Sequence, residues 1–155
     1  MKMKEPDFEE LEKKIGYKFN NKTLLKNALT HKTYAFEANI PLEYNERLEF
    51  LGDSILNFVV AEQLYKSNKY FSEGELTRRR AIGVNNKFLA KKAKELNIGK
   101  YILLGKGEIK QNGASNRTNL ANALEAIIGA VYLDSDGEKV TKFIINKIFN
   151  EEFQF

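Results

Sequence analysis

Residues 45–60 read NERLEFLGDSILNFVV, and this stretch decides the fold. On a helix that turns about 100° per residue, Glu46, Glu49 and Asp53 lie within roughly 60° of one another and share one narrow face. Apolar side chains cover much of the remaining circumference. A helix that is apolar over so much of its surface is mostly buried. The stretch therefore predicts a largely buried helix with three carboxylates on one face.

A second segment, residues 120–133, repeats this arrangement. It reads LANALEAIIGAVYL and is apolar almost all round. Asn122 and Glu125 are its only strongly polar side chains, and their spacing of three residues makes them face the same way on a helix. No Lys or Arg lies inside this segment. The chain thus predicts two apolar helices that each carry acidic or amide groups on one side.

Carboxylates in such helices need a compensating positive charge. Burying a lone carboxylate is costly unless it is paired or binds a metal ion, and clustered carboxylates also repel one another. Arg47 points about 100° away from the acidic face, so it does not supply that charge. A hard divalent cation such as Mg²⁺, which prefers oxygen ligands and water, fits best. For single acids other roles stay open: Glu46 would complement the helix dipole, and Asp53 would cap a neighbour or pair with a distant arginine.

The composition excludes several other chemistries. The 155 residues include no Cys and a single His, His31, which leaves no zinc–thiolate site, no Cys nucleophile and too few ligands for a zinc hydrolase. No G-x-S-x-G or P-loop pattern is present. We expect His31 to be structural or a polar surface contact. The 25 basic and 21 acidic residues give a net charge of +4, which permits a nucleic-acid partner without requiring one.

The rest of the chain favours an all-α, single-domain protein. Capping-box spacings at Asp7 and Ser72 predict helix starts, Asn21 opens another helix, and further helices are expected over about 45–66, 86–96 and 120–133 and after Val140. Residues 34–44 and 105–118 are interpreted as loops. No apolar stretch is long enough for a membrane span and no signal pattern is found, so a cytoplasmic protein with no membrane partner is expected.

The segment Asn45–Ser54 resembles the signature of ribonuclease III, the double-stranded RNA endonuclease. Further segments agree with the bacterial members of this family in the same order, and the resemblance covers about residues 8–150. These segments are GYKF at 16–19, ALTHKT at 28–33, SEGELTR at 72–78, LLGKGE at 103–108 and EAIIGAVYLD at 125–134.

The resemblance implies an all-α catalytic domain that forms a homodimer and holds duplex RNA in a valley along the dimer. Each subunit would supply one Mg²⁺-dependent site, with Mn²⁺ as a substitute, and would cut one strand. Products would carry 5′-phosphate and 3′-hydroxyl ends with a two-nucleotide 3′ overhang, as in rRNA and mRNA processing. Recognition would be mainly of A-form shape.

The resemblance also assigns roles to single residues. Glu49 and Glu125 match direct metal ligands, and Asp53 matches the carboxylate that is central to both catalysis and metal binding. Glu46 matches an outer acid of the catalytic set. Phe50 matches the aromatic side chain that inserts into a socket on the partner subunit.

Two departures from the family pattern qualify these expectations. The family has Asp where this chain has Asn122, so the metal site keeps an oxygen ligand there but loses one charge. The alternative function is therefore a catalytically weakened or inactive form that still binds double-stranded RNA. Bacterial members usually continue into a double-stranded RNA-binding domain, whereas this sequence stops at Phe155. We expect residues 1–155 to be the catalytic domain alone, with lower RNA affinity.

Overall fold

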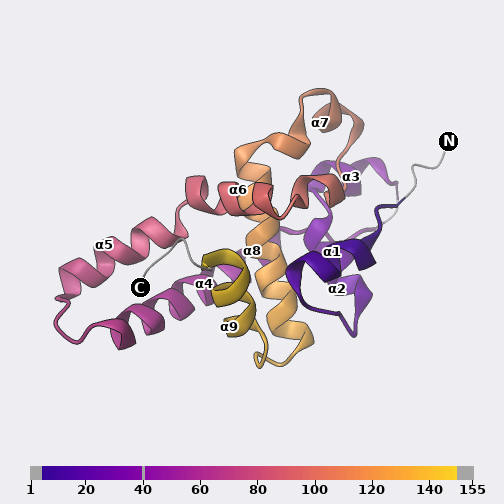
Figure 1. Ribbon diagram of the computed structural model, residues 1–155. Helices are drawn as coiled ribbons and strands as arrows, with labels where there is room; N and C mark the ends of the chain where they lie inside the picture. The colour runs from indigo at the N-terminus through magenta and orange to yellow at the C-terminus, as the bar shows by residue number, and fades with distance from the viewer. Residues whose placement is uncertain (1–4, 40, 150–155) are drawn as a thin grey trace.

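The computed structural model describes residues 5–39 and 41–149, and its regular structure in that part of the chain consists of helices joined by short connections (Figure 1). No β-strand occurs in these ranges, only an isolated bridge between Thr30 and Leu103. The elements are α1 (Phe8–Ile15), α2 (Lys22–Leu29), α3 (Lys32–Glu37), α4 (Glu46–Ser67), α5 (Glu73–Val84), α6 (Asn86–Glu95), η1 (Ile98–Tyr101), α7 (Lys106–Lys110), η2 (Gly113–Ser115), α8 (Arg117–Asp134), α9 (Val140–Phe143) and the π-helical η3 (Ile144–Phe149). The prediction of an all-α fold is confirmed.

Helix α8 is the centre of the molecule. Its residues from Leu120 to Val131 are buried, with the single exception of the half-buried Asn122. Helices α2, α4 and α6 all pack against it, as Figure 1 shows for the orange ribbon that runs through the middle of the fold. The nearly all-apolar sequence of residues 120–131 is thereby explained, because almost every side of this part of the helix meets protein. Tyr132 and Leu133, which follow it, are 39% and 46% exposed.

Helices α4 and α5 form an arm that extends away from the rest of the fold (Figure 1). The first half of α4 packs against α8, and its second half lies alongside α5. Large aromatic side chains on the arm remain exposed to solvent, among them Phe58, Tyr65 and Tyr70.

Local signals set most helix ends as the sequence predicts. Asp7 accepts a hydrogen bond from the Glu10 amide at 3.2 Å, and Ser72 accepts one from the Glu75 amide at 3.2 Å. Asn21 caps α2 through the amide of Thr23 at 3.0 Å. Gly16 ends α1 at a φ of 71°, a left-handed conformation in which glycine avoids the strain of a side chain.

Two loop predictions were wrong. Residues 34–37 belong to α3, and most of the 105–118 segment forms α7 and η2, with α8 beginning at Arg117. These helices are too short to show a periodic pattern, and a tertiary contact supports them: the Glu37 carboxylate accepts the amide of Lys106 at 2.9 Å. The final helix also differs from expectation, since α9 continues as a π-helix. None of the described helices has the length and apolar character required to cross a membrane.

Helices α4 and α8 cross with their backbones in close contact at two glycines. A Cβ atom added to Gly52 would stand 1.7 Å from the carbonyl oxygen of Glu125, and one added to Gly129 would stand 2.5 Å from the carbonyl oxygen of Leu48. Both distances are far shorter than van der Waals contact. The two helices can therefore approach this closely only because both positions lack a side chain.

We predict that Gly52→Ala lowers the free energy of unfolding by about 3 kcal/mol or more, because the helices must separate to admit the methyl group. Urea unfolding followed by circular dichroism measures the change. Gly107→Ala is the matched control, since a Cβ there meets nothing within 4 Å. The helix crossing is contradicted if the two variants unfold at the same urea concentration.

Candidate active site

The crossing of α4 and α8 brings the predicted site residues together around one cavity. The cavity has a volume of about 580 Å³ and lies beside the first half of α4. Its lining residues are Glu46, Glu49, Phe50, Asp53, Asn86, Asn122 and Glu125. Every site residue proposed from the sequence is in this set, although the two helices are far apart along the chain.

The acids of α4 stand on its exposed edge, whereas the acid of α8 lies deep. Glu46 and Asp53 are exposed, Glu49 is half-buried, and Glu125 is buried with 6% of its surface accessible. This gradient follows from the fold, because α8 is the central helix and α4 covers it. Gly52, which contacts the backbone of Glu125, lies between Glu49 and Asp53 in the chain. Glu49 and Asp53 are themselves about one turn apart on α4.

Burial and crowding raise the pKa of Glu125 to about 8. Burial is the largest cause, followed by a hydrogen bond with the Asp53 carboxyl group and by the negative charges of Asp53 and Glu49. The pKa of Glu49 is also raised, by burial and then by the charges of Glu46 and Asp53. The cavity therefore disfavours negative charge on Glu125 and favours its protonated form.

One protein cation that the sequence argument missed stands at the edge of the cavity. The Lys32 ammonium lies 3.7 Å from a carboxylate oxygen of Glu46, with both side chains about half exposed. Lys32 comes from α3, a helix that the sequence pattern did not predict. Arg47 turns away as expected and pairs with Glu43 at 3.7 Å. An exposed pair of this kind contributes little, so Lys32 does not offset the deeper carboxylates.

Asn86, the first residue of α6, also lines the cavity and was not identified from the sequence. Its amide adds a polar group opposite the carboxylates. Nothing in the sequence around it distinguishes it from the preceding Asn85, which caps α6 by accepting the Phe88 amide at 2.8 Å. Only the packing of α6 against α8 places Asn86 at the cavity.

His31 has a structural position, as expected. It caps α3 and its Nδ1 lies 2.7 Å from the Thr33 hydroxyl oxygen. Its backbone amide donates to the Leu103 carbonyl at 2.9 Å, beside the isolated bridge. His31 is not among the residues that line the acidic cavity.

The donor set of the cavity suits a hard divalent cation. In the described ranges, no three His, Cys, Asp or Glu side chains are grouped closely enough to hold a metal ion as they stand. The chemistry of the groups nevertheless fits, because every donor is a carboxylate or amide oxygen. The buried Glu125 carboxyl group, hydrogen-bonded to Asp53, indicates where positive charge is needed, and a bound cation would supply it. Small side-chain rotations would be needed to gather the oxygens.

Phe50 projects from the same turn of α4 as Glu49 and is 78% exposed. It lines the rim of the acidic cavity. A phenyl ring with this much accessible surface loses favourable burial free energy, about 2 kcal/mol for a side chain of its size. Phe50 is therefore an accessible apolar side chain at the rim of the acidic cavity.

Comparison with known proteins agrees with these observations. A family model described as ribonuclease-III-like matches residues 21–152. Ribonuclease 3 of Pasteurella multocida is 47% identical over 138 residues, which are 89% of this chain and 59% of that protein. The chain thus spans about six-tenths of the length of this relative.

Two solved structures of the nuclease domain of ribonuclease III from Campylobacter jejuni share the fold. The first superimposes with a TM-score of 0.87 at 39% identity and covers 96% of this chain and 98% of that one. The second, described for structural flexibility in a region involved in dimer formation, has a TM-score of 0.84 at 40% identity over 92% and 99% of the two chains. Because the family model matches residues 21–152 and the fold agrees over most of the chain, the chain belongs to the ribonuclease III family.

Proposed function

We propose that this chain is the catalytic domain, residues 1–155, of a divalent-cation-dependent endonuclease that hydrolyses double-stranded RNA. The observation that carries the proposal is the cavity in which four carboxyl groups and two amides converge, and whose crowding and burial raise the pKa of Glu125. Products with 5′-phosphate and 3′-hydroxyl ends and two-nucleotide 3′ overhangs are proposed from the family resemblance. A role in rRNA and mRNA processing in the cytoplasm is proposed from the same resemblance.

The proposed roles follow the depth of each side chain. Glu49, Asp53, Asn122 and Glu125 would hold Mg²⁺, or Mn²⁺ in its place, with Asp53 and Glu125 also part of the catalytic set. Glu46, at the exposed edge and paired with Lys32, would orient water or RNA rather than bind the cation directly. The chemistry that a divalent cation supplies to phosphodiester hydrolysis is activation of water and neutralisation of the charge that builds on phosphate.

Asn122 supports a second candidate, a double-stranded RNA-binding form with weak or absent cleavage. It is half-buried at the cavity and is the one position where the cation site lacks the family carboxylate. An amide oxygen still coordinates Mg²⁺ but carries no charge, so affinity for the cation falls. The fold and the RNA-binding surface do not depend on that charge.

We also propose that the domain acts as a homodimer through the outer face of α4. Phe50, Phe58 and Tyr65 are 78%, 68% and 77% exposed and lie within about 80° of one another around the helix. Exposed apolar side chains gathered on one face are typical of a protein–protein contact. The second Campylobacter jejuni nuclease domain is itself described as having a region involved in dimer formation.

The first test concerns the charge on Glu125. A carboxyl whose pKa is raised in the folded protein stabilises the fold below its unfolded pKa, and this contribution is lost as pH rises toward the folded value of about 8. In chelating buffer, wild type should lose on the order of a few kcal/mol of unfolding free energy relative to Glu125→Gln between pH 4.5 and 8. Denaturant unfolding at several pH values measures this difference.

Adding Mg²⁺ at pH 8 should then stabilise wild type and have little effect on Glu125→Gln. Glu9→Gln, at an exposed position of α1, serves as the control and should leave the pH dependence as in wild type. A pH dependence that is the same in wild type and Glu125→Gln contradicts the raised pKa.

The second test concerns Asn122. With labelled duplex RNA and Mg²⁺, Asn122→Asp should cleave at least about tenfold faster than wild type, because it restores a charged ligand to the cation site. Asn116→Asp makes the same change at the cap of α8, outside the cavity, and should not alter the rate. Cleavage must disappear in chelator.

Three outcomes separate the candidates. A large gain for Asn122→Asp over a slow wild type supports the weakened form, and brisk wild-type cleavage with no gain supports the active enzyme. Absence of cleavage by both proteins with Mg²⁺ and with Mn²⁺ contradicts the proposed endonuclease.

The third test concerns Phe50. Phe50→Ala should weaken self-association about tenfold or more, since buried aromatic side chains dominate protein interfaces. Sedimentation equilibrium over a range of concentrations gives the dissociation constant. Tyr70→Ala removes another ring that is 83% exposed and should have a much smaller effect. An unchanged monomer–dimer equilibrium in Phe50→Ala counts against its role in the dimer.

A further inference from the structure

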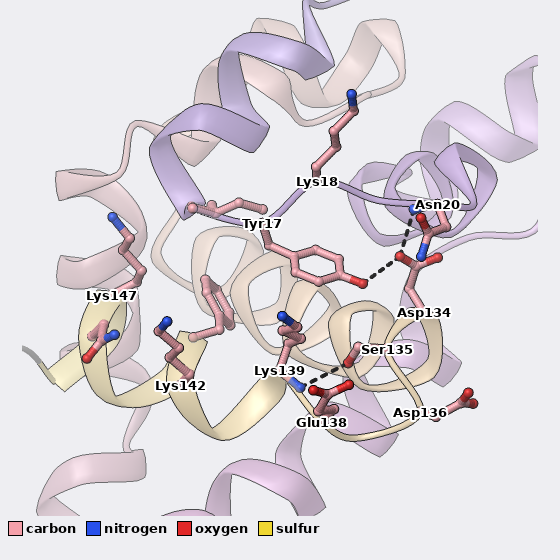
Figure 2. A pocket seen from close by; sticks show the side chains of 14 residues that line it. Tyr17, Lys18, Asn20, Asp134, Ser135, Asp136, Glu138, Lys139, Lys142 and Lys147 are labelled. Carbon is pink, nitrogen blue, oxygen red and sulfur yellow. Dashed lines mark hydrogen bonds between the residues drawn. The ribbon is translucent and has the colours of Figure 1, made fainter.

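A second cavity lies at the C-terminal end of α8. It has a volume of about 640 Å³ and is enclosed by the connection between α1 and α2, by the residues that follow α8, and by α9 and η3. Figure 2 shows the side chains that line it. Asp134, on its wall, is nine residues beyond Glu125, which corresponds to about 14 Å along the helix axis. The acidic cavity and this one share no lining residue.

Four lysines line this cavity and give it its character. They are Lys18, from the connection between α1 and α2, and Lys139, Lys142 and Lys147, from the stretch that leads into and forms α9 and η3 (Figure 2). Elsewhere many lysines pair with a carboxylate, as Lys22 does with Glu12 at 2.7 Å. Within residues 5–39 and 41–149, none of these four ammonium groups makes an ion pair.

Three carboxylates line the cavity with the four lysines, which leaves a formal charge of +1. Asp134 is engaged by the protein, since its carboxylate accepts the Tyr17 hydroxyl at 2.6 Å and the amides of Asn20 and Asn21 at 2.8 Å each. Asp136 is exposed and directed away from the lysines in Figure 2, whereas Glu138 lies close to Lys139. Burial is outweighed by hydrogen bonds from Tyr17, Asn21 and Asn20, which lower the pKa of Asp134, so this carboxylate keeps its negative charge.

The wall of the cavity is shaped to hold at least one of the lysines. Gly16 has a φ of 71°, and a Cβ atom added there would stand 2.9 Å from Cε of Lys147. The Lys147 stem therefore lies across the position that a side chain would occupy at the end of α1. Tyr17 and Phe143 supply aromatic surface beside it.

We propose that this cavity binds a small anion that carries several phosphate groups, the chemical class of tripolyphosphate and nucleoside triphosphates. An ammonium group is a compact point charge with three donors, which suits phosphate oxygens. The volume lies in the range typical of small-ligand sites. A duplex RNA presents its phosphates on a convex, rigid surface and does not enter a concave cavity of this size. The proposal is independent of the endonuclease assignment.

Isothermal titration of the protein with tripolyphosphate in chelating, low-salt buffer tests the proposal. Wild type should bind at a stoichiometry of one per chain. The double variant Lys142→Ala/Lys147→Ala should bind at least about tenfold more weakly, because it loses two charge-assisted contacts. The control Lys66→Ala/Lys69→Ala removes the same charge from the last turn of α4 and the turn that follows it, outside the cavity, and should bind like wild type. ATP, as a second probe, should compete with tripolyphosphate.

Other outcomes overturn the proposal. Equal weakening in both double variants would show attraction to net charge alone. Absence of tripolyphosphate binding, together with loss of duplex RNA affinity in Lys142→Ala/Lys147→Ala, would assign the lysines to an RNA-binding surface instead. Circular dichroism establishes that each variant is folded, and both substitution pairs lie at exposed or half-exposed positions.

Discussion

The backbone contact between α4 and α8 is the constraint on which the rest of the structure depends. At Gly52 and Gly129 the two helices approach so closely that a methyl group on either would overlap the carbonyl oxygen of the other helix. Close packing of this kind places one helix of the acidic cavity directly against the other. Without it, the carboxylates of α4 and the carboxylate of α8 would belong to separate surfaces.

This contact has an electrostatic consequence. It brings Asp53 within hydrogen-bonding reach of a buried Glu125, and the pKa of Glu125 rises to about 8 as a result of its burial, that hydrogen bond and the neighbouring charges. A fold selected for stability alone would not place carboxylates together in this way. Local destabilisation that other parts of the fold tolerate is typical of functional sites. The buried apolar residues of α8 supply the compensating stability.

The sequence predicts the helices with strong local signals and the acids that they carry. Caps at Asp7, Asn21 and Ser72 lie where expected, and the two apolar segments form α4 and α8. What it does not predict depends on contacts between distant residues. Helix α7 is an example, because the amide of its first residue, Lys106, bonds to Glu37 on another helix.

The same division applies to the candidate site. Carboxylate positions follow from helical periodicity. Asn86 reaches the cavity, and Lys32 reaches Glu46, from elements whose placement no local pattern reveals. Gly52 and Gly129 are also indistinguishable from other glycines until the helices are seen to cross. Charge crowding was inferred from the sequence, but its concentration on Glu125 reflects the depth of α8 in the fold.

The most direct test of this account is the titration of the Glu125 side-chain carboxyl carbon, followed by ¹³C NMR in chelating buffer and again with Mg²⁺. Burial and the neighbouring Asp53 raise the pKa of Glu125 to about 8. The titration midpoint without the cation should therefore lie near pH 8. With Mg²⁺ the midpoint should fall by several pH units, because the cation takes the place of the proton. A midpoint near pH 4.5 that is unaffected by Mg²⁺ would contradict the account, since an ordinary glutamate has about that value.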